Sequence, residues 1–175
     1  MMHNDCEILP GLIKITHFLE SDETENMLFI LFKDNFFNLY YRNKLIRIRK
    51  EPLVRGKPET FFHIICDHNL KGHEYNTISQ ERAQRLLWGP AIIKNEPCHK
   101  GCNECDGIYV WYFDYQSKNG VRKRLKLYHK KYSYLVILEE RETYWLYITS
   151  YRVDNSQSRR ELILEYKKQR VLNHS

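Results

Sequence analysis

The sequence predicts an α+β protein, with helices packed on an antiparallel sheet of about four strands, plus an N-terminal β-meander and a cysteine-rich loop. The C-terminal half carries four segments in which apolar and polar residues alternate, as they do in half-buried strands. Two further segments, after Ser79 and after Asn155, space their apolar residues as amphipathic helices do. The 175 residues are 42% hydrophobic, which is enough for one sizeable core.

Residues 1–55 are expected to form the N-terminal β-meander extension. Met27–Arg49 is rich in aromatic and β-favouring side chains and has turn candidates at Lys33–Asn35 and Arg42–Lys44. The segment Glu51–Glu59 contains two prolines and a glycine, which is typical of a connecting loop. It separates the extension from a second module over residues 56–175.

The second module is expected to begin with a short strand, Phe61–Cys66, and to continue through a polar loop into a helix. Thr77 or Ser79 can cap that helix, and Gly89-Pro90 breaks or kinks it. A cysteine loop follows at residues 95–107. Four strands and a terminal helix then complete the module, at Ile108–Tyr115, Arg122–His129, Tyr132–Glu139, Tyr144–Tyr151 and Asn155–Val171.

The formal charge of +6 favours a polyanionic partner such as nucleic acid, although solubility alone explains it equally well. No apolar run approaches the length of a membrane-spanning helix, and the N-terminus lacks the layout of a signal peptide. We therefore expect a cytoplasmic protein with no membrane partner, or one exported without a cleavable signal.

His63 is the natural acid–base group of the chain, because the unperturbed pKa of histidine lies near neutrality. Arg82 and Arg85 are three residues apart on the expected helix, so both can reach one phosphate. Thr149 closes the last strand and can donate to a phosphate oxygen. The alternatives are a buried core histidine, a solvated helix face with a Glu81–Arg85 pair, and an ordinary strand end.

The segments PETFFHI, ERAQRLLWGPAIIKN, RLKLYHKKYSYLVILEE and YWLYITSYRV, in that order, resemble the prophage-associated branch of the barnase–EndoU–colicin–RelE (BECR) nuclease superfamily. The resemblance covers roughly residues 58–168. It implies helices packed on a four-stranded antiparallel sheet and metal-independent RNA cleavage. As site residues it implies His63, Arg82, Arg85 and Thr149, with Tyr151 in addition.

One strand in this region is strongly basic. One face of the expected strand carries Arg122, Arg124, Lys126 and Tyr128. Three cations followed by an aromatic ring suit the binding of a nucleic-acid backbone. The alternative is a solvated edge strand protected by lysines. His129, on the other face, is either a second catalytic imidazole or an edge residue.

Cys98, Cys102 and Cys105 provide three thiolates within eight residues, which favours a structural zinc ion. His99, Cys66, His68 or His129 would provide the fourth ligand. The alternative is that these cysteines are reduced and free.

The leading hypothesis is an endoribonuclease of a toxin or phage-conflict type that acts on RNA, with an immunity or antitoxin protein as a candidate partner. The rival is a non-catalytic, zinc-stabilised nucleic-acid-binding protein in which His63 belongs to the core.

Overall fold

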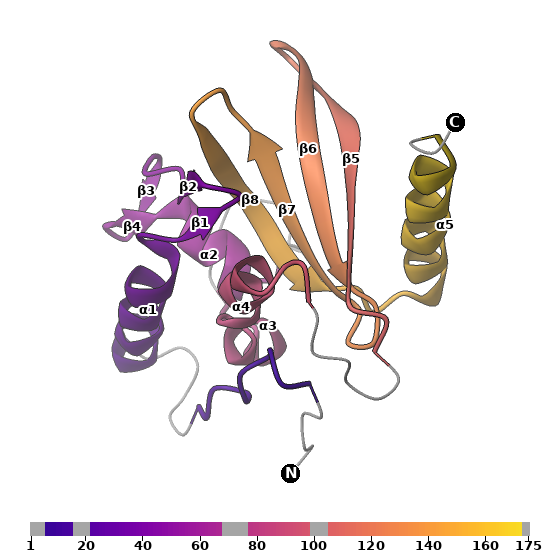
Figure 1. Ribbon diagram of the computed structural model, residues 1–175. Helices are drawn as coiled ribbons and strands as arrows, with labels where there is room; N and C mark the ends of the chain where they lie inside the picture. Colours follow the sequence, from indigo (N-terminus) through magenta and orange to yellow (C-terminus); the bar gives the residue numbers. More distant parts are fainter. Residues whose placement is uncertain (1–5, 16–21, 68–76, 99–104, 173–175) are drawn as a thin grey trace.

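The computed structural model describes residues 6–15, 22–67, 77–98 and 105–172. Helices and strands mix in an α+β arrangement, as expected (Figure 1). The main sheet has six strands rather than about four, in the order β1-β2-β8-β7-β6-β5. A separate two-stranded hairpin consists of β3 (Leu53–Val54) and β4 (Lys57–Pro58).

Four antiparallel strands near the C-terminus form the larger part of the main sheet, close to their predicted positions. They are β5 (Ile108–Ser117), β6 (Gly120–His129), β7 (Tyr134–Glu140) and β8 (Tyr144–Arg152). The terminal helix α5 (Ser156–Leu172) is likewise present. Because β6 lies between β5 and β7, the basic strand is interior, and its interpretation as an edge strand is wrong.

The predicted N-terminal meander is wrong over most of its length. Residues Asp22–Phe36 form a helix, α1, which buries Leu28, Phe32 and Phe36 on one side at four-residue spacing. Only β1 (Tyr40–Tyr41) and β2 (Lys44–Arg47) are strands. Arg42 and Asn43 both have positive φ, the geometry of a tight hairpin turn at the predicted position.

The predicted strand at Phe61–Cys66 is also wrong, because Glu59–Ile65 form the helix α2. Residues after Ser79 form two short helices, α3 (Gln80–Gln84) and α4 (Trp88–Lys94), instead of one. Pro90 lies in the first turn of α4, where its missing N–H costs no hydrogen bond, so it does not end a helix there.

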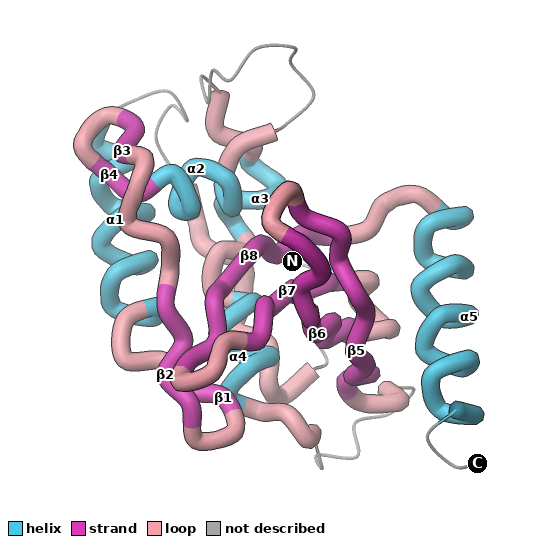
Figure 2. Tube along the Cα trace, turned by 90° about the horizontal axis from the view of Figure 1, so that it is seen from above, coloured by secondary structure: helices cyan, strands magenta, loops and turns pink. Residues whose placement is uncertain are grey.

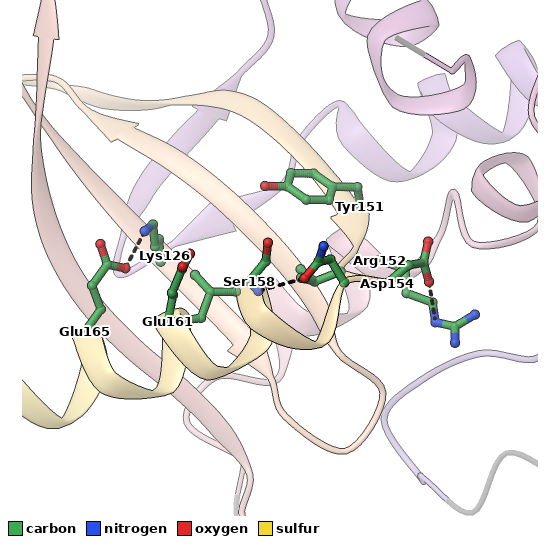
Figure 3. Close-up of a pocket in the computed structure, with 10 residues that line it drawn as sticks. Lys126, Tyr151, Arg152, Asp154, Ser158, Glu161 and Glu165 are labelled. Atoms are coloured by element: carbon green, nitrogen blue, oxygen red, sulfur yellow. Dashed lines mark hydrogen bonds and ion pairs between the residues drawn. The ribbon is translucent and has the colours of Figure 1, made fainter. Parts of the chain in front are cut away.

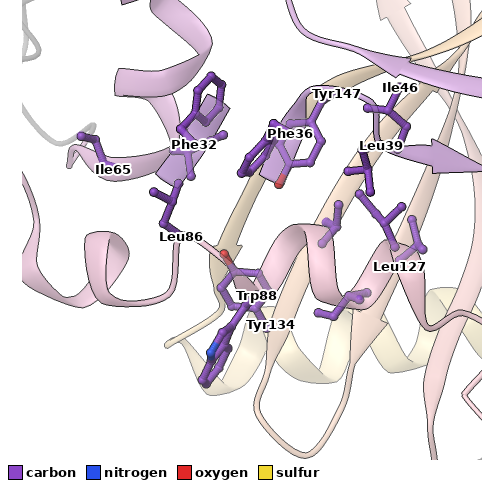
Figure 4. Packing of buried hydrophobic residues seen from close by; sticks show 14 of the residues in the cluster. Phe32, Phe36, Leu39, Ile46, Ile65, Leu86, Trp88, Leu127, Tyr134 and Tyr147 are labelled. Carbon is purple, nitrogen blue, oxygen red and sulfur yellow. The ribbon is translucent and has the colours of Figure 1, made fainter. Parts of the chain in front are cut away.

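One face of the sheet packs against helices α1 to α4 and forms the main core. Phe32, Phe36, Leu86, Leu127 and Tyr147 meet there, from elements far apart in the sequence (Figure 4). The strand β2 joins this assembly by pairing in parallel with β8, Leu45 lying opposite Tyr144. Residues of the expected extension thus share the sheet and the core with the second module.

The other face of the sheet carries a smaller apolar cluster beneath α5. Trp111, Tyr128 and Leu135 pack there against Val153 and Leu162. The hairpin that joins β5 to β6 extends past the end of α5, which therefore covers only part of this face (Figure 1). The uncovered part of this face carries the polar groove described below.

Candidate functional site: a basic groove beside α2

A groove of about 900 Å³ lies on the uncovered part of the second sheet face, between α2 and the β5–β6 hairpin. From α2 it is lined by Glu59, Thr60 and His63. The strands and the loops next to them contribute a larger set, which comprises Arg49, Tyr115, Gln116, Ser117, Lys118, Asn119, Arg122, Arg124, Glu139, Arg141, Tyr147 and Ile148. Seen from above, α2 and the β5–β6 hairpin lie at the same end of the molecule (Figure 2).

The lining has a clear excess of positive charge. Three groove cations have no ion pair in the described part of the chain, namely Arg49, Lys118 and Arg122. Positive charge without a neutralising partner attracts phosphate, and a groove concentrates the field. The floor is thus suited to a polyanion.

Arg124, Glu139 and Arg141 form a triad at the bottom of the groove. Arg124 Nε donates to Glu139 Oε2 at 2.9 Å, and Arg141 donates to the other carboxylate oxygen. Glu139 is only 2% exposed, and its two arginine partners compensate the buried carboxylate. The guanidinium of Arg124 also stacks on Tyr115, 3.5 Å from the ring centre. Two cations share one anion, and the triad keeps a net positive charge.

His63 and Glu59 are the two groups in the groove that suit proton transfer. They are four residues apart on α2, which puts both on one face of the helix, and both are half-buried. Glu59 was missed in the sequence because Phe61–Cys66 was interpreted as a strand. A helical interpretation places Glu59 one turn from His63 and would have found it.

Arg82 and Arg85, predicted to hold a phosphate, make contacts within the fold. Arg82 donates from Nε to the carbonyl of Ile64 at 3.0 Å and from a terminal nitrogen to that of His63 at 2.9 Å. Arg85 pairs with Glu81 at 2.7 Å and lies over the ring of Trp88. Neither arginine lines the groove. Arg82 therefore binds the backbone carbonyl of His63 and does not lie beside the imidazole ring in the groove.

Thr149 and Tyr151 do not line the groove either. The alternation of a regular strand would put Trp145, Tyr147, Thr149 and Tyr151 on one face of β8, but a β-bulge interrupts it. The pairing of β7 with β8 shifts between Ile137 and Leu138, so Ile148 is the extra residue. Tyr147 faces the main core, whereas Thr149 lies opposite Ile137 and Tyr151 packs in the cluster beneath α5.

The predicted basic face of β6 exists, but the residues along it have different surroundings. Leu125 and Leu127 point into the main core, as expected for the opposite face. Arg122 and Arg124 line the groove. Lys126 instead bonds Glu165 of α5 at 2.5 Å, and Tyr128 is 1% exposed beneath α5. Tyr128 is therefore a core residue and offers no ring for a base to stack on.

A second, smaller pocket of about 380 Å³ lies between the end of β8 and α5 (Figure 3). Lys126, Tyr151 and Arg152 line it together with the carboxylates of Asp154, Glu161 and Glu165. Since Lys126 pairs with Glu165 and Arg152 with Asp154, the cations in this pocket are neutralised. The groove beside α2, whose described residues keep unpaired positive charge, is the better binding site for an anionic ligand.

The predicted cysteine site is only partly described. Cys102 lies outside the described residues, as do His99 and His68, whereas Cys66 is buried at the C-terminal end of α2. Cys105 Sγ lies 3.8 Å from His129 Nε2, and Cys6 Sγ lies 3.3 Å from the same nitrogen. His129 is fully buried, and burial lowers its pKa, which favours the neutral ring. The part of the chain that the structure describes holds no preformed group of three metal-ligating side chains.

Comparisons of this chain with protein-family models, with curated proteins and with solved structures found no match. Within the described residues, no helix is long and apolar enough to cross a membrane.

Proposed function

We propose that the protein is a metal-independent endoribonuclease that binds RNA in the groove beside α2. The observation that carries the proposal is the position of His63, which shares this groove with Arg122 and Arg124. The sequence alone separates these residues by about sixty positions, and each was singled out there for a different reason. The order of segments that resembles the BECR nucleases supports the same function.

The groove contains the groups that RNA cleavage through the 2′-hydroxyl requires. A base must remove the hydroxyl proton, an acid must protonate the leaving oxygen, and cations must stabilise the phosphorane. Glu59 and His63 lie on one helix face and suit the first two tasks. Arg122 and the Arg124–Glu139–Arg141 triad supply positive charge opposite them. Arg82, Arg85, Thr149 and Tyr151 have no part in this version of the site.

The first experiment measures cleavage of labelled RNA in buffer free of divalent metal. We expect fragments with cyclic phosphate ends from the RNA and none from DNA of the same sequence, which lacks the 2′-hydroxyl. His63→Gln is expected to slow cleavage by about 100-fold or more, because a positioned acid–base group contributes on that scale. Its circular dichroism and RNA affinity should match those of the wild type. Full activity of His63→Gln would remove His63 from the mechanism.

A non-catalytic RNA-binding protein is the second candidate. The contacts of Arg82 and Arg85 favour this candidate. Both cations were expected to bind the scissile phosphate, but they contact the helices α2 and α3. A mobility shift of RNA without fragments identifies the binder, and neither shift nor fragments rejects both functions.

A matched pair of variants tests the groove itself under either function. Arg122 lines the groove, whereas the neighbouring Lys123 lies on the opposite face of β6, near the ring of Tyr112. Arg122→Gln is expected to weaken RNA binding and to reduce the slope of log affinity against log salt by about 0.7, the value for one phosphate contact on a single strand. Lys123→Gln should change neither. Equal effects of the two variants would mean that RNA does not bind in the groove.

A further inference from the structure

Two thiols meet one buried imidazole at the end of the sheet opposite the β5–β6 hairpin. Cys6 comes from the N-terminal segment, Cys105 precedes β5, and His129 ends β6. Both sulfur atoms approach the same ring nitrogen, Nε2, at 3.3 and 3.8 Å. These residues are up to 123 positions apart, so chain connectivity does not account for their meeting.

Hydrogen bonding alone does not explain this arrangement. A neutral imidazole nitrogen either donates one proton or accepts at one lone pair, so it satisfies one thiol and not two. Two thiols and one imidazole are the ligand types that zinc prefers, and here they lie near one another without forming, among the described residues, a preformed metal site.

The distances agree with a shared ion. In a tetrahedral zinc site with ordinary bond lengths, a thiolate sulfur and an imidazole nitrogen lie about 3.6 Å apart. The two observed separations, 3.3 and 3.8 Å, lie on either side of that value.

The backbone around all three residues is anchored. Beyond Cys6, the carbonyl of Pro10 accepts from Trp88 Nε1 at 2.9 Å, and Ile13 N donates to Gln84 O at 3.0 Å. His129 pairs with Ile108 and Tyr134 in neighbouring strands. Beside Cys105, the Asp106 carboxylate accepts from Lys130. Cys6 is buried, whereas Cys105 is half-buried and leaves a route for a metal to enter.

We propose that Cys6, Cys105 and His129 are ligands of one structural zinc ion, with Cys98 as the fourth. Cys98 is partly buried against the main core, and a Cβ on Gly107 would lie 3.7 Å from its carbonyl oxygen, so its backbone runs beside the start of β5. This ligand set differs from the one that the cysteine spacing indicates, since two ligands come from outside the loop. The ion would fasten the N-terminal segment to the sheet, and this role does not depend on RNA cleavage.

The test measures zinc in the full-length protein, purified under reducing conditions without chelator and reconstituted with zinc. We expect about one zinc per chain, and cobalt in its place should give the visible absorption of a tetrahedral thiolate site. Cys6→Ala, Cys105→Ala and His129→Gln should each lose stoichiometric zinc, and Cys98→Ala should bind it more weakly. Cys66→Ala is the matched control, because it also removes a buried free thiol but lies outside the cluster.

Cys105→Ala keeps the test decisive even where the buried variants fail to fold, since its side chain is half-exposed. No zinc in the reconstituted wild type would overturn the proposal, as would wild-type zinc content in Cys105→Ala. A disulfide between Cys6 and Cys105, detected by alkylation and mass spectrometry in the protein purified under reducing conditions and reconstituted with zinc, would overturn it as well.

Discussion

Gly89 shows at the scale of one residue how tightly α4 packs on the sheet. A Cβ at this position would collide with the hydroxyl oxygen of Tyr147 and lie 3.2 Å from Ser150 Oγ. Both contacts are buried, so nothing nearby can move into solvent. The glycine is needed here for close approach, because its own φ is not among the positive ones.

Gly89→Ala is therefore expected to lower the free energy of unfolding by about 1–3 kcal/mol, the usual cost of overpacking a core. Urea unfolding followed by circular dichroism measures the change. Gly11→Ala is the control, because a Cβ there meets no atom within 4 Å. Adding Tyr147→Phe to Gly89→Ala removes the colliding oxygen and should recover part of the loss. Equal stability of Gly89→Ala and wild type would contradict the packing described here.

Individual site residues were predictable to different degrees. His63, Arg122 and Arg124 could be chosen from the sequence, because histidine chemistry and a run of cations are visible in one segment. Arg82 could not be placed correctly, since the sequence does not show that the carbonyls of His63 and Ile64 lie within its reach. Arg49 and Arg141 come from loops distant in sequence, and only the fold brings them to the groove.

Arg82 also acts at the scale of secondary-structure elements, because it joins α3 to the C-terminal end of α2. Its guanidinium satisfies two carbonyls at once, which lysine cannot do in the same geometry. Arg82→Lys is therefore expected to cost about 1–2 kcal/mol in the free energy of unfolding, with RNA affinity of the folded protein unchanged. The opposite result, unchanged stability with lost RNA binding, would restore the phosphate-binding role first predicted for Arg82.

Elements were predicted well where their pattern is local. The four C-terminal strands alternate with period two, and the SKNG turn marks the hairpin between β5 and β6. The helices α1 and α2 were mistaken for strands because they are rich in aromatic and β-branched residues. In α2, five of seven residues are buried, and with only Glu59 and His63 on its polar face the segment is too short to reveal a helical period.

At the scale of the whole molecule, buried tyrosines couple stability to alkaline pH. Burial raises the pKa of Tyr134 from 10.0 to about 12, and burial also raises the pKa values of Tyr147 and Tyr41. The folded protein therefore holds protons that the unfolded chain releases. The contribution of Tyr134 to stability is complete below about pH 10 and is lost as the pH rises from there through about 12.

Urea unfolding at successive pH values should show stability falling over this interval. Tyr134→Phe removes one titrating group, so its decline should be shallower, although loss of the bond to Ser150 lowers its stability at neutral pH. Tyr40→Phe is the control, since Tyr40 is 58% exposed. A decline in Tyr134→Phe as steep as that of the wild type would show that Tyr134 does not titrate in this range.

The parallel pairing of β2 with β8 has a consequence for the chain during its synthesis. Hairpins from β5 to β8 close between neighbours, but β2 pairs early only with β1, and its other edge has no partner until Leu146 has been made opposite Arg47. At ordinary elongation rates the ribosome takes roughly 5–20 s to make the intervening residues. Throughout that interval β2 has an unpaired edge, and the apolar side chains of α1 to α4 have no complete sheet to pack against. The nascent chain is therefore most exposed to aggregation before its last strand emerges, and chaperones have their longest opportunity to bind there.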